Sequence, residues 1–206
     1  QEVGTAEETE AKVPAWQDVL STLSRASAEG WGLTVLDVKC AFLYAPLPAG
    51  QPPVAVRPPA LLNRLGLVAA GQVWLLKKAL YGLRAAPKHW TDHRDEVFGR
   101  LVLNTGGQKL SLHAVAGTEV WHILVDAPRQ AGKNPTASYR PLPLGQLTRK
   151  TETDRSQEDG LPGPPGKIVG YLIPYVDDIS ILGADEVRAC VAEALGKAWS
   201  VKVEGE

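Results

Sequence analysis

The sequence contains no methionine and only two cysteines, Cys40 and Cys190. The absence of methionine, even at position 1, suggests a piece of a longer translation product. Two cysteines are too few for a disulfide framework and lack metal-ligand spacing, so we expect reduced thiols. No window approaches the 18 or so consecutive apolar residues of a membrane span, and the acidic start QEVGTAEETE is unlike a signal peptide. With no targeting signal visible, the sequence predicts a cytoplasmic protein without a membrane partner.

The sequence also lacks a strong net charge, which is −1 at pH 7. This average gives no global signature of nucleic-acid binding, but it conceals a basic segment, 57–109, and an acidic segment, 168–206. Two such blocks can form a polyanion-binding surface beside a metal site. With 206 residues, 44% of them hydrophobic and 22% charged, the chain has the composition of a globular protein with one large domain or two small ones.

Hydrophobic periodicity predicts an α+β chain. From Pro14 the spacing is helical, with one apolar stripe formed by Trp16, Val19, Leu20, Leu23 and Ala26. Further helices are predicted over 86–103 and 186–198, whereas the prolines of 44–59 predict an irregular connection. Apolar runs predict strands at 31–38, 120–125, 167–176, 179–183 and 201–203. This order is compatible with a split βαβ, ferredoxin-like antiparallel sheet that carries helices on one face.

The chain divides into four segments. Residues 1–13 are predicted to be a disordered acidic lead, and the regular elements fall in 14–125 and 168–206. Between them, residues 126–167 are rich in Pro and Gly and poor in aliphatic side chains. Such a segment cannot bury enough surface to offset its ordering entropy, so it is predicted to be a disordered insertion.

Three carboxylates interrupt apolar runs. Asp37 closes TVLDV, and Asp177 and Asp178 fall inside YLIPYVDDISIL, which has the pattern of a β-hairpin with an acidic turn. A carboxylate near a core normally needs a cation partner. Neither predicted strand supplies one for all three, and oxygen ligands from adjacent strands suit Mg²⁺. Each feature alone has a simpler explanation, because Asp is common in turns and at strand ends.

A second constellation is KKALYGLRAAPKHW, residues 77–90. Its cations and interleaved aromatic side chains lie where a helix is predicted to begin, which suits contact with phosphates and stacked bases. The alternative is a solvated helix start with Tyr81 and Trp90 in the core, and composition alone favours that alternative.

Three motifs occur in order: DVKCAFLYAPL, VWLLKKALYGLRAAPKHW and YVDD. Together they resemble the reverse transcriptase of Ty1/copia-type LTR retrotransposons, over about residues 14–100 and 167–204. The resemblance implies a polymerase palm with part of the fingers, truncated before the thumb, and RNA-directed DNA polymerase (nucleotidyltransferase) activity. It marks 126–167 as an insertion. Pro174 departs from the family pattern, and because it cannot donate to a strand ladder, it implies an edge position or a bulge.

The resemblance also implies roles for single residues. Asp37, Asp177 and Asp178 would be catalytic and, with the backbone carbonyl of Val38, would hold two Mg²⁺ ions, for which Mn²⁺ is a possible substitute. The incoming nucleotide would contact Phe42, Tyr81 and Gly82, with Phe42 beneath its sugar. Template and primer would contact Arg84, Pro87, Lys88 and Tyr175.

The partners that the resemblance implies are an RNA or DNA template, a primer, dNTPs and other parts of a Pol polyprotein, namely integrase and RNase H. The expected location is a cytoplasmic virus-like particle. An alternative from another functional class remains open: a non-enzymatic transposon relic that keeps the palm fold and at most binds nucleic acid.

Overall fold

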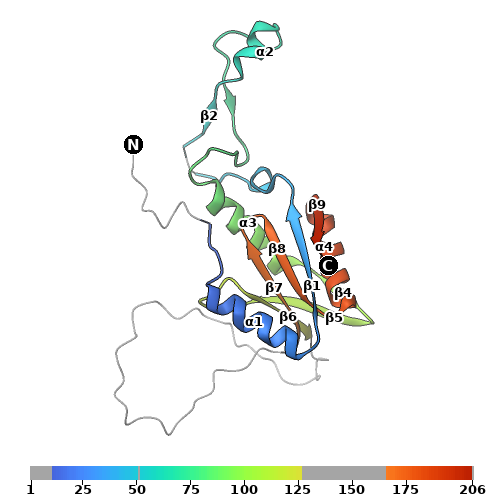
Figure 1. Ribbon diagram of the computed structural model, residues 1–206. Helices are drawn as coiled ribbons and strands as arrows, with labels where there is room; N and C mark the ends of the chain where they lie inside the picture. Colours follow the sequence, from blue (N-terminus) through green and yellow to red (C-terminus); the bar gives the residue numbers. More distant parts are fainter. Residues whose placement is uncertain (1–10, 51, 127–165, 206) are drawn as a thin grey trace, which may run out of the picture.

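The computed structural model describes residues 11–50, 52–126 and 166–205, and within them it shows a curled antiparallel sheet of seven strands with the order β4-β5-β6-β7-β8-β1-β9 (Figure 1). Register shifts at Ile123/Leu124 and Val35/Leu36 mark irregularities of the β-bulge kind, which bend a sheet and increase its twist. The strands are β1 Gly32–Val38, β4 Leu103–Thr105, β5 Gln108–Ala114, β6 Trp121–Asp126, β7 Gly166–Tyr175, β8 Asp178–Gly183 and β9 Val201–Gly205.

Helices cover both faces of this sheet. On one face, α3 (Ala86–Arg100) and α4 (Asp185–Ala198) pack over the main core, which includes Leu36, Leu172 and Ile181. On the other face, α1 (Trp16–Ala28) packs against β7 and β8 over a smaller cluster that includes Tyr171 and Leu182. The α+β class is therefore confirmed, but the prediction that all helices lie on one face is wrong for α1.

The apolar stripe predicted for α1 is confirmed for Val19 and Ala26, which pack against the smaller cluster, but wrong for its bulkier members. Trp16 is 67% exposed and Leu20 is 48% exposed, whereas Thr22 and Ala26 are buried. Thr22 can be buried because its hydroxyl donates a 2.7 Å hydrogen bond to the carbonyl oxygen of Asp18 one turn earlier. The small side chain of Ala26, and the Thr22 hydroxyl whose hydrogen bond is made within the helix, let α1 lie close to the sheet. The bulky side chains therefore remain on its outer side.

Other elements agree with their predictions. The strand at 31–38 is β1, the strand at 120–125 is β6, and the two halves of the acidic hairpin are β7 and β8. Pro174 pairs with Ile179 of β8, and the pairing of β6 with β7 ends at Leu172, so none of the described strands lies on the other side of Pro174. It thus occupies a local edge, as expected for a residue without an N–H donor. The predicted lead lies mostly outside the described residues, and the predicted insertion lies almost entirely outside them.

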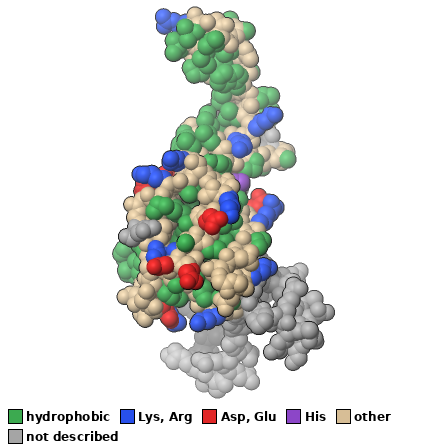
Figure 2. Space-filling model, turned by 90° about the vertical axis from the view of Figure 1, so that its right-hand side faces the viewer, with side chains coloured by type: hydrophobic (Ala, Val, Ile, Leu, Met, Phe, Trp, Pro, Cys, Tyr) green, Lys and Arg blue, Asp and Glu red, His purple; other side chains and the backbone are tan. Residues whose placement is uncertain are grey.

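Two features have no counterpart in the sequence prediction. One is the hairpin of β4 and β5, whose tight turn contains Gly106 and Gly107, both with positive φ. The other is an arm formed by residues 52–76, which extends beyond the sheet (Figure 1). The arm contains β2 (Ala55–Val56), β3 (Trp74–Leu75) and the short helix α2 (Ala60–Arg64), and hydrophobic side chains gather on it in the space-filling view (Figure 2).

Candidate functional site

The pairing of β1 with β8 brings together carboxylates that are 141 positions apart in sequence. Asp37 of β1 lies in register with Asp178 of β8, and residues paired in this way have Cα atoms about 4.5–5.5 Å apart. Their neighbours Leu36 and Ile179 are fully buried in the main core. Because side chains alternate along a strand, Asp37 and Asp178 point to the opposite, partly open face of the sheet.

Asp177 lies in the two-residue connection between β7 and β8. Tyr175 pairs with Asp178, so the loop consists of Val176 and Asp177. The hairpin prediction is therefore confirmed, with the refinement that Asp178 is the first residue of β8. The carbonyl oxygen of Asp177 accepts a 3.0 Å hydrogen bond from the backbone N–H of Val38. This bond joins the end of β1 directly to the acidic turn.

The backbone is strained on both sides of the carboxylates. Among the described residues, two non-glycine residues have positive φ: Cys40 at 55°, after β1, and Val176 at 53°, in the acidic turn. Left-handed conformations are unfavourable for residues other than glycine, and especially so for β-branched Val. Such strain occurs preferentially at functional sites, where the surrounding structure maintains it.

The carboxylates influence one another electrostatically. Burial raises the pKa of Asp178 above its ordinary value, and the nearby charges of Asp177, Asp37 and Glu204 raise it further. The arrangement therefore concentrates negative charge on one face of β1, β8 and β9. A site of this kind favours a bound cation, since a cation would relieve the repulsion.

Strand β9 supplies two charged residues that sequence reasoning missed. Lys202 lies in register with Asp37, on the side of β1 opposite to β8. Its ammonium group forms a 3.1 Å ion pair with Glu204 on the same strand. The alternation in VKVEG indicated a strand, but no local signal showed that β9 pairs with β1 rather than with another edge.

The three carboxylates provide the hard oxygen donors that Mg²⁺ prefers. As the side chains stand, no group of three or more His, Cys, Asp or Glu residues in the described part of the chain is arranged to hold a metal ion. Burial raises the pKa of Asp178, and the charges of Asp177 and Asp37 add to that rise, so a cation placed here would offset their negative charge. In its chemistry and charge, this donor set is of the kind that a divalent cation prefers, and Asp37, Asp177 and Asp178 are the residues that would hold one.

Two aromatic residues predicted to bind the nucleotide meet beside this acidic face. Phe42, in the short helix η2 (Ala41–Tyr44), lies with its ring centroid 4.8 Å from that of Tyr81. Tyr81 is 53% exposed, and burial raises its pKa, with additional contributions from the charges of Cys40, Asp177 and Asp37. Hydrogen bonds from Leu47 to Lys77 and from Ala79 to Ala45 hold the two segments together. Tyr81 is thus on the surface, and the core position that the alternative assigned to it is wrong.

The other predicted contact residues surround the start of α3 and the acidic turn. Gly82 precedes the helix with φ of 95°, Arg84 is exposed, and Pro87 lies in the first helical turn. Lys88 forms a 2.6 Å ion pair with Asp92 one turn later. Tyr175 is 57% exposed and lies in register with Asp178, so it shares the acidic face. Trp90 is fully buried, as the alternative for this segment expected.

We expect Asp178→Asn to raise thermal stability in a chelating buffer at neutral pH, by about 1–2 °C. Because its pKa is raised, Asp178 binds a proton more tightly in the folded chain than in the unfolded chain. Its ionisation therefore lowers stability as the pH rises above the ordinary pKa of 3.8, and the variant should lose its advantage below that pH. Thermal unfolding measured across this pH range checks the prediction. A lower melting temperature for the variant at neutral pH would show that the Asp178 carboxylate stabilises the start of β8.

Comparison with known proteins finds no family model, no curated protein and no solved structure that matches the chain. No helix in the described ranges is both long enough and apolar enough to cross a membrane.

Proposed function

We propose that the chain is the palm, with part of the fingers, of a copia-type RNA-directed DNA polymerase. The observation that carries this proposal is the register of β1 and β8, which sets Asp37 beside Asp178 and next to the Asp177 turn. The motifs that resemble the reverse transcriptase were separate in sequence. In the fold, Asp37 and Asp178 share one partly open face of the sheet and Asp177 lies in the adjoining turn, with Tyr81 near Asp37 and Asp177 and with Phe42 against Tyr81.

In the proposed reaction, the 3′-hydroxyl of a primer attacks the α-phosphate of a dNTP and releases pyrophosphate. Asp37, Asp177 and Asp178 would hold two Mg²⁺ ions, which would lower the pKa of the hydroxyl and stabilise charge on the attacking and leaving oxygens. The backbone holds these carboxylates in place, because Asp37 and Asp178 lie on paired strands and the Asp177 carbonyl accepts a hydrogen bond from the Val38 N–H. Metal ions bound to them would in turn position the primer hydroxyl and the dNTP. Such positioning accounts for much of the catalysis in phosphoryl transfer.

The proposed contacts with the nucleotide, template and primer rest on the exposure and charge of the residues around the carboxylates. Tyr81 and Phe42 present aromatic surface next to the carboxylates, where a nucleotide would bind. Arg84 and Lys88 place positive charge at the start of α3, where the N–H groups of the first helical turn also favour phosphate. These groups are suited to the backbones of template and primer.

Primer extension tests the proposal. The assay uses the protein within its full-length gene product, a DNA primer annealed to an RNA template, dNTPs, and Mg²⁺ or Mn²⁺. We expect extension that requires the metal and stops on chelation. Nucleic-acid binding without extension would instead support the non-enzymatic relic, and the absence of both would contradict the two functions together.

Phe42→Val is expected to increase the use of rNTPs relative to dNTPs. The Phe42 ring, beside Tyr81, would lie beneath the deoxyribose and offer no hydrogen-bond partner to a 2′-hydroxyl. Burying that unpaired hydroxyl costs roughly 1–3 kcal/mol, which corresponds to about 5- to 150-fold discrimination. Single-nucleotide extension with matched dNTP and rNTP measures the ratio. Leu43→Val in the same short helix is the control, because Leu43 is 40% exposed; an unchanged ratio in Phe42→Val would identify Phe42 as a packing residue.

A further inference from the structure

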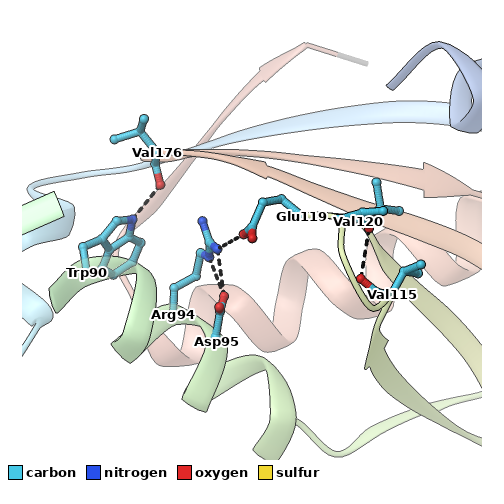
Figure 3. A network of polar contacts seen from close by, with 8 residues as sticks. Trp90, Arg94, Asp95, Val115, Glu119, Val120 and Val176 are labelled. Atoms are coloured by element: carbon cyan, nitrogen blue, oxygen red, sulfur yellow. Dashed lines mark hydrogen bonds and ion pairs between the residues drawn. The ribbon is translucent and has the colours of Figure 1, made fainter. Parts of the chain in front are cut away.

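A hydrogen bond links the start of α3 to the acidic turn. Trp90 is fully buried, and its indole Nε1–H donates a 2.6 Å hydrogen bond to the carbonyl oxygen of Val176 (Figure 3). Trp90 ends the segment KKALYGLRAAPKHW, and Val176 directly precedes Asp177. The basic segment and the acidic turn, which are 86 residues apart in sequence, are therefore in direct contact.

This hydrogen bond restrains Asp177 through the backbone. The Val176 carbonyl belongs to the peptide unit that precedes Asp177, so fixing it restrains ψ of Val176 and φ of Asp177. The peptide unit that follows Asp177 is restrained as well, because its carbonyl accepts the hydrogen bond from Val38. Both peptide units around Asp177 are thus held by other parts of the fold, in a turn whose first residue has positive φ. A left-handed conformation is intrinsically unfavourable for Val176, so the turn depends on these contacts to keep it.

The Trp90 ring also packs in a buried aromatic cluster. The ring of Trp199 meets that of Trp90 edge-on at 5.0 Å, and the Trp199 ring lies 6.0 Å from that of Phe98. Trp199 is itself 3% exposed, and its Nε1–H lies 3.4 Å from Nε2 of His93. A donor held by close packing can keep its acceptor in one position, as supporting residues do around other functional sites.

We propose that Trp90 is a positioning residue that sets the orientation of Asp177 through the Val176 carbonyl. The position of Asp177 relative to the other carboxylates then depends on where the start of α3 lies. The inference rests on the proposed function, since it assigns Trp90 a role in the same site. Trp90 itself touches neither substrate nor metal. Its indole N–H is the part of the side chain that carries the role, because packing requires only the ring.

Trp90→Phe tests this role, since it retains an aromatic ring and removes the N–H. Trp199→Phe is the matched control: it is the same substitution in an equally buried neighbour, but the N–H that it removes faces His93. We expect both variants to lose similar thermal stability. Only Trp90→Phe should shift the carbonyl-carbon NMR signal of Val176, accelerate hydrogen exchange of the Asp178 amide about tenfold or more, and weaken Mn²⁺ binding by about 10- to 100-fold.

Primer extension completes the test. Trp90→Phe should raise the Mg²⁺ concentration at half-maximal rate by a similar factor, and Trp199→Phe should not. Equal effects of the two variants on the Val176 signal and on Mn²⁺ binding would overturn the inference, because Trp90 would then be a packing residue. If the unsubstituted protein does not extend primers but the Val176 signal and Mn²⁺ binding change only in Trp90→Phe, the proposed function fails while the positioning role stands.

Discussion

Asp177→Asn is expected to abolish primer extension, reducing its rate by about a thousandfold or more, while the fold remains intact. The substitution removes a negative charge from the turn between β7 and β8, where Asp177 would hold metal together with Asp37 and Asp178. It leaves the backbone hydrogen bond from Val38 to the Asp177 carbonyl in place. Extension rates with Mg²⁺ and with Mn²⁺, together with circular dichroism and thermal unfolding, measure both parts of the prediction.

Asp185→Asn is the control for this change. Asp185 begins α4, and its side chain is 92% exposed and forms an ion pair with Arg188. The control removes the same charge from the surface of the same domain and should retain nearly full activity. Extension by Asp177→Asn at more than a tenth of the original rate would contradict the assignment of Asp177 as a metal ligand.

Glu119→Ala is expected to destabilise the fold by about 3 kcal/mol. Arg94 of α3 is fully buried, and its Nη2 lies 3.1 Å from Glu119 and 2.8 Å from Asp95 (Figure 3). Its Nη1 has no hydrogen-bond partner among the described residues. Removing Glu119 would leave the buried guanidinium with Asp95 alone, and breaking one side of a buried ion pair costs far more than an exposed pair contributes.

Glu96→Ala on the same helix is the matched control, because the pair of Glu96 with Arg100 is exposed and should contribute less than about 1 kcal/mol. Urea unfolding of both variants gives the two free energies. Equal losses would mean that Arg94 is adequately neutralised by Asp95. Burial raises the pKa of Glu119 although the charge of Arg94 lowers it, so desolvation of the carboxylate outweighs the attraction. The cost expected for Glu119→Ala is thus that of leaving the buried guanidinium of Arg94 with one partner fewer.

The local part of the fold could be predicted from sequence. The apolar run before Asp37 is β1, the acidic hairpin is β7 and β8, and the helix that follows it is α4. These elements follow from periodicity within short windows, which depends on neighbouring residues alone. The hairpin of β4 and β5 could also have been found, because Gly106-Gly107 between alternating segments is a turn signal.

Sequence periodicity misjudged α1 because it ranks side chains by hydrophobicity and not by the space available. Trp16 and Leu20 form an apolar stripe in sequence, but both are exposed in the structure. The helix buries Ala26, which belongs to that stripe, and Thr22, which does not, and the small side chains of both allow close approach to β7 and β8. Which face of a helix is buried depends on the surface it meets, and that surface is formed by distant residues.

The sequence by itself determined that three carboxylates interrupt buried strands, and that a basic, aromatic segment leads into a helix. Only the tertiary structure decided that Asp37 lies beside Asp178, that β9 adds Lys202 and Glu204 to the same face, and that the indole of Trp90 bonds to the Val176 carbonyl. Strand alternation sets the side of the sheet to which each residue points, and it is encoded locally. Strand partners and long-range hydrogen bonds are set by the packing of the whole core, which no short stretch of sequence encodes.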